Sequence, residues 1–503
     1  MASPSATSVW LSTAQVPSYS PLTSDTSADV CVVGGGITGL TVAYLLAQVG
    51  KSVVVVEDGA IGSGMTGVTT AHLVNALDDR YFELERFHGE RGSRLAAESH
   101  TAAIDRIESI VARERIACDF DRLDGYLFCA PEHDEAYLDR ELAAIHRSGL
   151  HNVAKIGRTP LSFDTGPCLR FPSQAQFHPV KYLSGLAEAI ERAGGRIYAG
   201  THATQITGGS AASVSTQGGT VKAGSIVVAT NVPVNDLVVV HTKQAPYMTY
   251  VIGAQLPRDS VPLALFWDTG DPYHYVRVQR GVDSDHDLLI VGGEDHKSGQ
   301  ADDIEQRHPR LEAWARERFP SMGDVVYRWG GQVMEPVDGL AFIGHNPMDH
   351  ENVYMVTGDS GNGLTHGTIA GILLTDLILK RHNPWEALYD PGRITLRAAG
   401  EFAKEAVNTA AQYTDWVTAG DVASPDEIAK DSGAVIRRGA AKVAIYRDAT
   451  GELHERSAVC PHLGCIVAWN PAEKTWDCPC HGSRFDKFGV VINGPANVGL
   501  LKT

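Results

Sequence analysis

Residues 28–58 read ADVCVVGGGITGLTVAYLLAQVGKSVVVVED, and this stretch decides the fold class. Its first apolar run, residues 30–33, is largely β-branched and is typical of a buried parallel strand. Three glycines follow with the spacing G-x-G-x-x-G, and apolar residues then recur as they do on a helix packed against a sheet. A second apolar strand, residues 53–56, ends at Glu57. Strand, glycine turn, helix, strand and acid in this order predict a dinucleotide-binding βαβ unit.

Each residue type in this unit has a physical reason to bind a dinucleotide. Gly34 permits a tight turn, Gly36 lets the backbone approach a pyrophosphate, and Gly39 allows the helix to pack closely on the strand. The helix N-terminus offers partial positive charge to the phosphates. Glu57 can accept hydrogen bonds from a ribose diol. The predicted contacts are Gly34, Gly36, Ile37, Thr38, Gly39 and Glu57.

Composition excludes several classes of protein. The 503 residues carry a formal net charge of -17, which argues against a nucleic-acid partner because phosphate binding needs clustered lysine and arginine. No apolar run reaches the roughly 18 residues of a membrane span. The Ser/Thr/Pro-rich arm at residues 1–27 lacks the features of a secretory signal, so the expected location is cytoplasmic.

The remaining chain divides into segments of different texture. SIVVATN (225–231) and VYMVTG (353–358) have the composition of further buried strands, and residues 81–116 have helical spacing. PYMTYVIGAQLP and DPYHYVRVQRG alternate like antiparallel strands. After a connector at 381–416, residues 417–503 break into short β-like runs, which predicts a small all-β module.

The glycine spacing alone does not distinguish FAD from NAD. TGDSGNGLTHG (357–367), preceded by EPVDGLAFIG (335–344), resembles the late glycine turn and preceding strand of the D-amino-acid oxidase and glycine oxidase family of flavoproteins. IGSGMTGVTTAHL (61–73) resembles the region of that family that runs beneath the flavin ring. The further FAD contacts that this resemblance implies are Gly64, Thr66, Thr70, Ala71, His72, Gly358, Gly361, Asn362, Gly363, Leu364 and Thr365.

The resemblance also implies a domain plan and a fold class. It covers residues 28–380, with FAD-binding parts at about 28–80, 178–235 and 335–380, and substrate-domain parts at about 81–177 and 236–334. The implied fold is an α/β, Rossmann-like FAD-binding domain with an antiparallel-sheet substrate domain, joined to the small all-β module.

Members of the family bind the substrate carboxylate through an arginine on a strand reading Y-x-R. In YHYVRVQRG this position is Arg277, beside Tyr275, and Tyr247 is a further candidate for lining the pocket. The alternative is that Arg277 is an ordinary strand arginine and that the tyrosines serve packing. Because some relatives attach flavin through a histidine, a covalent link at His72 also remains open.

Two short motifs, CPHLGC (460–465) and CPCHGS (478–483), lie close together near the C-terminal end of the chain. Two cysteines and two histidines at these spacings also suit zinc. The complete pattern, with NGPA at 493–496, resembles the Rieske proteins. That resemblance implies that Cys460 and Cys478 bind one iron of a [2Fe–2S] cluster, that His462 and His481 bind the other, and that Cys465 and Cys480 form a disulfide.

The two resemblances together imply a dehydrogenase. Hydride transfer from the carbon beside an amine or amino-acid nitrogen, including N-methylated ones, would reduce FAD, and electrons would pass singly to the cluster. An external acceptor follows, which is a protein carrier, a quinone or O2. The alternatives are an H2O2-forming oxidase with a structural cluster, a non-enzymatic relay, and a Rieske oxygenase. The sequence leaves open a homo-oligomer and whether the two cofactors meet within one chain.

Overall fold

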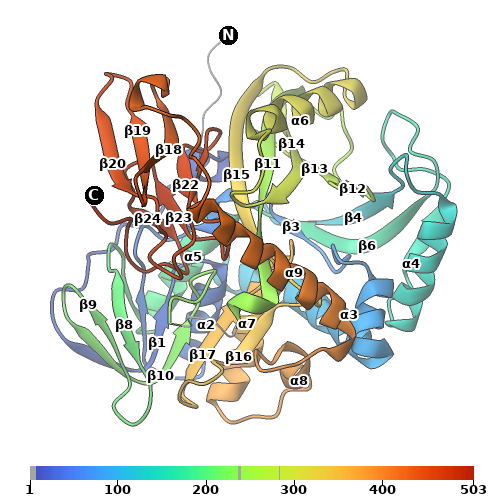
Figure 1. Cartoon of the computed structure of the whole chain (residues 1–503). Helices are drawn as coiled ribbons and strands as arrows, with labels where there is room; N and C mark the ends of the chain where they lie inside the picture. Colours follow the sequence, from blue (N-terminus) through green and yellow to red (C-terminus); the bar gives the residue numbers. More distant parts are fainter. Residues whose placement is uncertain (1–6, 236–239, 282–283) are drawn as a thin grey trace.

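The computed structural model describes residues 7–235, 240–281 and 284–503, and Figure 1 shows their arrangement. The stretch at 28–58 forms the predicted unit, in which β1 (Thr26–Val33) lies parallel to β2 (Val53–Val56) and α2 (Ile37–Gln48) connects them. All four residues of β2 are buried, as expected for a strand covered on both faces.

This unit is the centre of an eight-stranded sheet. Its main strand order is β16-β17-β10-β1-β2-β7, with β9 paired to β10 and β8 paired to β9. The strands β1, β2, β7, β10 and β17 run parallel, and β16 pairs antiparallel with β17 at one edge. The bounds not yet given are β7 (Arg196–Tyr198), β8 (Ala203–Thr207), β9 (Ser213–Thr216), β10 (Thr220–Val228), β16 (Phe342–His345) and β17 (Val353–Thr357). Helices α5 (Pro179–Arg192) and α7 (Gly363–Ile378) pack with α2.

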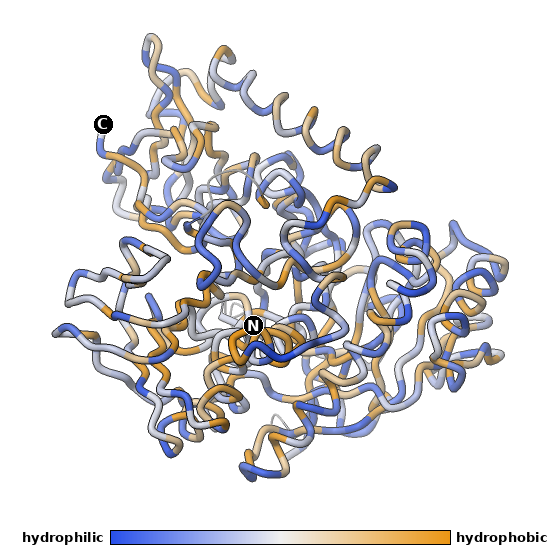
Figure 2. Tube along the Cα trace, turned by 90° about the horizontal axis from the view of Figure 1, so that it is seen from below, coloured by the Kyte–Doolittle hydropathy of each residue, from blue (hydrophilic) through white to orange (hydrophobic). Residues whose placement is uncertain are grey.

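A nine-stranded sheet forms the second layer. Its main order is β15-β11-β14-β13-β12-β4-β6-β3, with β5 on β6. The strands are β3 (His72–Leu73), β4 (Asp121–Phe128), β5 (Ala154–Ile156), β6 (Cys168–Gln176), β11 (Gln244–Pro257), β12 (Leu265–Asp268), β13 (His274–Gln279), β14 (His286–Lys297) and β15 (Val325–Pro336). The helices of this part are α3 (Tyr81–Glu114), α4 (Glu135–Arg147) and α6 (Ile304–Arg318). Figure 2 shows that apolar residues gather in the interior of the molecule.

The C-terminal module has two small antiparallel sheets. The first contains β18 (Ser432–Arg438), β19 (Ala441–Arg447) and β20 (Leu453–Ser457), and the second β21 (Ala468–Asn470), β22 (Thr475–Asp477), β23 (Arg484–Asp486) and β24 (Val491–Asn493). The connector contains α8 (Glu386–Tyr389) and α9 (Ala399–Gln412), and α9 crosses the front of the molecule in Figure 1. These architectures confirm the predicted fold class.

The N-terminal arm is docked on the body of the molecule. In α1 (Val9–Thr13), Trp10 is fully buried and its Nε1 donates to the Thr69 carbonyl over 2.6 Å. Thr13 hydrogen-bonds to His178, beside α5. The described part of the arm therefore helps to hold the segment at 66–70. No helix among the described residues combines the length and apolar character that a membrane crossing requires.

Candidate functional site

A cavity of about 300 Å³ lies between the two large sheets. One end is formed by the glycine turn after β1 and by Glu57, the middle by residues 64–72, and another wall by the turn before α7. All the predicted FAD contacts line this cavity except Gly39, Ala71 and Thr365. The cavity therefore brings together three segments that are far apart in the sequence.

The three exceptions have other contacts. A side chain at Gly39 would collide with the carbonyl of Gly34, so this glycine serves the close packing of α2 on the turn. Thr365 hydrogen-bonds to His100 Nδ1 over 2.8 Å inside the protein. Ala71 is buried, and its carbonyl accepts a hydrogen bond from Arg277 over 3.0 Å.

The chemistry of the cavity fits FAD. Helices α2 and α7 both begin at the cavity, at Gly36 and Asn362, and neither of these N-cap residues makes a side-chain cap, although the Ile37 amide of α2 donates to Thr66 Oγ1 over 3.1 Å. Uncapped helix amides suit phosphate oxygens. Glu57 lines the cavity next to them, where its carboxylate accepts hydrogen bonds from the amides of Gly35 and Gly59. This end of the cavity therefore offers amide donors for phosphates and a carboxylate for a ribose.

His72 lies in the cavity as an uncharged imidazole. Burial, with a smaller effect of Arg277, lowers the pKa of His72 to about 3. Its Nδ1 contacts the Thr70 hydroxyl at 3.1 Å, and its Nε2 is buried without a hydrogen-bond partner among the described residues. The ring lies edge-on to Tyr275, with centroids 5.9 Å apart. An imidazole nitrogen is thus free to meet a group in the cavity, whereas a covalent link at His72 stays a prediction.

Arg277 does not occupy the position that the family pattern implies. It is fully buried and does not line the cavity. Its Nη1 donates to the carbonyls of Ala71 and Phe177, at 3.0 and 3.2 Å, and its Nη2 to Gln279 Oε1 at 2.6 Å. The guanidinium therefore fixes the backbone behind His72, and in this geometry it is not available to a substrate carboxylate.

The predicted tyrosines are separated. Tyr247 lies in a different cavity, beside Glu335 and α9. Tyr275 lines the main cavity, and its hydroxyl hydrogen-bonds to Thr249 Oγ1 over 2.6 Å. Of these two candidates, only Tyr275 is placed where it can touch a substrate.

The acidic residues of the cavity were not among the site residues predicted from the sequence. We call the wall formed by His72, Asp78, Thr249, Tyr273, Tyr275 and Asp295 the acidic wall. Tyr273 donates from its hydroxyl to Asp78 Oδ2 over 3.0 Å. Burial raises the pKa of Asp78 to about 6 and that of Asp295 to about 7. An aspartate just after the 61–73 segment and one in the middle of a strand gave no motif that could identify them.

The two cysteine and histidine loops meet in the C-terminal module. Cys465 and Cys480 form a disulfide that joins the loops. Cys460 and Cys478 are buried free thiols. Hydrogen bonds lower the pKa of Cys460 to about 7, against the effect of burial. The largest contribution comes from Cys478, followed by the His462 amide and the Ser483 hydroxyl.

The donor set at these loops fits a Rieske cluster. The rings of His462 and His481 lie edge to face, with centroids 5.1 Å apart. The Nδ1 atom of His481 is buried and has no hydrogen-bond partner among the described residues. Two cysteine thiolates and two neutral imidazoles are the ligands of this cluster type, so Cys460, Cys478, His462 and His481 would hold it.

The flavin cavity and the cluster loops share a wall. Residues 491–494 and 496–497 of the C-terminal module line the cavity. Gln332 of β15 also lines it, donates from Nε2 to the Gly482 carbonyl over 2.8 Å, and accepts from Asn493 Nδ2. From the other side, His241 packs edge-on against His462, with centroids 5.0 Å apart. The predicted cluster histidines therefore face the large domain of the same chain.

Comparisons with known proteins agree with this two-part organisation. Residues 29–377 match the family model DAO, described as FAD dependent oxidoreductase, and residues 418–502 match the Rieske [2Fe-2S] domain. YhfW of Bacillus subtilis (strain 168), whose name assigns it to the Rieske 2Fe-2S iron–sulfur proteins, is 31% identical over 97% of this chain and 95% of its own length.

Two further similarities concern the larger domain. Gamma-glutamylputrescine oxidoreductase of Escherichia coli (strain K12) is 29% identical over 75% of this chain and 91% of its own length. The crystal structure of glycine oxidase from Geobacillus kaustophilus superposes with a TM-score of 0.62 at 19% identity, covering 73% of this chain and 99% of that one. At this identity the structural likeness supports the fold alone.

Proposed function

Because this chain belongs to the DAO family of FAD dependent oxidoreductases and carries a C-terminal Rieske [2Fe-2S] domain, we propose that it oxidises an amine or amino acid and passes the electrons to the cluster within the same chain. FAD would supply a two-electron acceptor for the hydride that leaves the carbon beside the nitrogen, and the cluster a one-electron acceptor. Water would hydrolyse the resulting imine to a carbonyl compound.

The observation that carries this proposal is the shared wall between the cavity and the cluster loops. Gln332 contacts both, and the loop of the C-terminal module that contains Asn493 and Ala496 lines the cavity. Ser483 of the second cluster loop also accepts a hydrogen bond from the Ala496 amide over 3.0 Å. A purely structural cluster would not need its loops at the flavin cavity, so the arrangement supports electron transfer between the two sites.

The residues of the chain have distinct parts in this reaction. The N-termini of α2 and α7 would hold the FAD phosphates, and Glu57 would hold the ribose. His72 and Tyr275 would lie where the substrate meets the flavin. Binding and orientation account for catalysis of this kind without a strong base. The E. coli relative, named as a gamma-glutamylputrescine oxidoreductase, supports an amine among the substrates.

An anaerobic substrate screen with two readouts tests the proposal. The holoenzyme is mixed with amines, amino acids and their N-methylated forms, and flavin absorbance and the EPR signal of the reduced cluster are recorded. We expect bleaching of the flavin followed by the EPR signal. Bleaching without the EPR signal, with stoichiometric H2O2 in air, would favour the oxidase alternative. A flavin that no compound bleaches, but that a chemical reductant does, would favour the electron relay.

The acceptor that takes electrons from the cluster belongs to the same proposal. A protein carrier, a quinone and O2 are the candidates. Once the substrate has reduced the enzyme, the carrier or quinone is added without air, or O2 is added as a solution. The acceptor that abolishes the EPR signal of the reduced cluster fastest is taken as the acceptor of this enzyme.

A further inference from the structure

The acidic wall carries negative charge with no cationic side chain opposite it. Asp78 and Asp295 line the cavity, and no lysine or arginine does so among the described residues. The residues that the structure does not describe, 1–6, 236–239 and 282–283, contain no lysine or arginine either. Arg277 is occupied by backbone carbonyls behind His72. Arg80, whose charge lowers the pKa of Asp78 against the larger effect of burial, donates to the carbonyls of Leu77 and Asp268 and does not line the cavity. A substrate carboxylate would therefore meet two acids and no cation.

The backbone at Asp295 is held in an irregular conformation. Met248 of β11 pairs with His296 of β14, and Tyr250 with Gly293, so Glu294 and Asp295 together face the single residue between them on β11. This is a β-bulge, a device that often re-aims a side chain beside an active site. Glu294 has a φ of 61°, a left-handed conformation that a residue other than glycine adopts at a cost.

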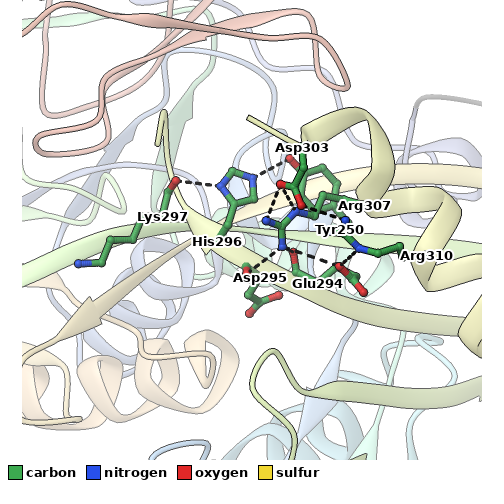
Figure 3. Close-up of polar contacts among 8 residues, drawn as sticks. All are labelled: Tyr250, Glu294, Asp295, His296, Lys297, Asp303, Arg307 and Arg310. Atoms are coloured by element: carbon green, nitrogen blue, oxygen red, sulfur yellow. Dashed lines mark hydrogen bonds and ion pairs between the residues drawn. The ribbon is translucent and has the colours of Figure 1, made fainter. Parts of the chain in front are cut away.

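Helix α6 holds this bulge in place, as Figure 3 shows. Arg307 Nη1 donates to the carbonyls of Glu294 and Asp295, at 3.2 and 3.4 Å, and its Nη2 pairs with Asp303 over 2.7 Å. Arg310 Nε donates to Glu294 Oε2 over 2.8 Å. These contacts direct both guanidinium groups to the backbone and to other acids. They therefore fix Asp295 without an ion pair to its carboxylate, although the charge of Arg307 lowers the pKa of Asp295 against the larger effect of burial.

The carboxylate of Asp295 is only partly satisfied. The Thr249 side chain hydrogen-bonds to this carboxylate, whereas its Oδ1 is buried and has no hydrogen-bond partner among the described residues. Leaving a buried polar group unsatisfied costs about 1–3 kcal/mol, and more for a charged group. Such a group at the wall of a cavity calls for a donor from the ligand. The nearby rings of Tyr273 and Tyr275, with centroids 5.3 Å apart, add faces that attract cations.

We propose that Asp295, assisted by Asp78, binds the ammonium group of the substrate, so that the cavity selects cationic amines without a carboxylate on the reacting carbon. This inference rests on the proposed function of the same cavity. The bound ammonium would pass one proton to a carboxylate of this pair, and the neutral amine could then give a hydride, with two electrons, to FAD held in the cavity, which would leave the substrate as an iminium ion. The carboxylate gains the proton that the amine loses, so charge and atoms balance.

Binding can be tested separately from oxidation. The tert-butylammonium ion has no hydrogen on the carbon beside nitrogen and cannot be oxidised, and pivalate has the same shape with the opposite charge. Each is titrated into the FAD-loaded enzyme while the flavin spectrum is followed. We expect tert-butylammonium to perturb the spectrum and pivalate not to do so. Asp295→Asn and Asp78→Asn should each weaken tert-butylammonium binding about tenfold, which corresponds to about 1.4 kcal/mol.

A surface acid provides the matched control. Asp139 pairs with Lys155 on the exterior, so Asp139→Asn should bind the cation like the wild type. Equal binding by the Asp295 and Asp78 variants and the wild type, or preferential binding of pivalate, would overturn the inference. If either variant loses its FAD, Tyr273→Phe, which removes the hydroxyl that contacts Asp78, should still change the affinity for the cation.

Matched substrates separate this inference from the proposed function. Butylamine and norvaline each have a single amine and differ only in the carboxylate on the reacting carbon, and we expect butylamine to bleach the flavin faster. Faster bleaching by norvaline would overturn the inference and leave the proposed function intact. Cation binding that depends on Asp295, with no bleaching by any amine, would contradict the proposed function and support the inference.

Discussion

At the scale of single residues, Asp295 contributes unfavourably to stability at neutral pH. Burial raises its pKa from the ordinary 3.8 to about 7, so the folded chain binds this proton more tightly than the unfolded chain does. The stabilisation that the folded chain gains from binding this proton is fully present below about pH 4 and is lost as the pH rises through about 7. The loss is of order 1 kcal/mol for each pKa unit.

Asp295→Asn should remove this pH dependence. We expect the melting temperature of the variant, relative to the wild type, to be higher at about pH 8 than at about pH 5, because only the wild type must bury an ionised carboxylate at the higher pH. Differential scanning fluorimetry of both proteins without added substrate measures it. For the control variant Asp139→Asn, in which an exposed carboxylate is replaced, the difference in melting temperature from the wild type should be the same at both pH values. An unchanged difference for the Asp295 variant would mean that its carboxylate is not buried.

The residues around the cluster predict its reduction potential. Ser483 is buried beside Cys460. The resemblance to the Rieske proteins implies a second donor two residues later, a tyrosine hydroxyl in the high-potential members, and this chain has Phe485 at that position. Because one donor is missing, we expect a midpoint in the lower part of the range of about -150 to +300 mV. Phe485→Tyr should raise it by roughly 40 mV if the new hydrogen bond is worth about 1 kcal/mol to the reduced cluster. Voltammetry measures both values, with Phe485→Leu as the control; a wild-type midpoint near +300 mV would contradict this account.

At the scale of elements, the sequence predicted those whose signal is local. The strands and helix of 28–58 follow from residue periodicity and glycine spacing, and the cluster loops from the order of their cysteines and histidines. Likewise, the turn before α7 could be placed at the cavity because strand, glycine and helix signals follow one another without interruption.

Elements whose geometry depends on distant partners could not be predicted. The bulge at Asp295 requires the register of β11 and two arginines of α6, and no local pattern encodes either. The same reason explains why the contacts of Arg277 could not be predicted. The Y-x-R pattern places an arginine on a strand, but the carbonyls of Ala71 and Phe177, which are remote in sequence, decide what it binds.

The hydrogen bonds of Gln332 in strand β15 predict that this strand supports electron transfer between the flavin and the cluster. Gln332→Leu removes the hydrogen bonds to Gly482 and Asn493 and leaves their buried groups unsatisfied, at a cost of about 1–3 kcal/mol. We expect the substrate to reduce the flavin at the wild-type rate and the cluster to be reduced more slowly. Stopped-flow absorbance and freeze-quench EPR measure the two steps. Gln300→Ala is the matched control, because Gln300 also hydrogen-bonds to the C-terminal module, at the Pro479 carbonyl, but does not line the cavity. An equal slowing of cluster reduction in both variants would contradict a special role of β15.

At the scale of the whole molecule, the C-terminal module is attached to the large domain at several separate places. Asn497 Nδ2 donates to the Ala203 carbonyl over 2.9 Å, and His202 hydrogen-bonds to the Asn497 carbonyl. The connector adds further ties, because Lys297 Nζ pairs with Glu405 of α9 over 2.6 Å and Trp416 Nε1 donates to the Gly464 carbonyl over 2.9 Å. These contacts keep the module against the flavin cavity of its own chain.

This attachment predicts that the electrons move within one chain. The rate of cluster reduction after substrate mixing should be first-order and independent of enzyme concentration over about a hundredfold range, because no encounter between molecules is needed. A complementation experiment makes the same point with two defective proteins. Cys478→Ala would lack the cluster, and Gly36→Val would block the approach of FAD to the turn after β1.

The mixture of the two variants should bleach its flavin with substrate and yet show no EPR signal on the wild-type timescale. Each chain retains one site, but the shared wall at Gln332 joins sites only within a chain. A reduction rate that rises with enzyme concentration, or a mixture that recovers the wild-type EPR signal, would mean that the electrons cross between chains.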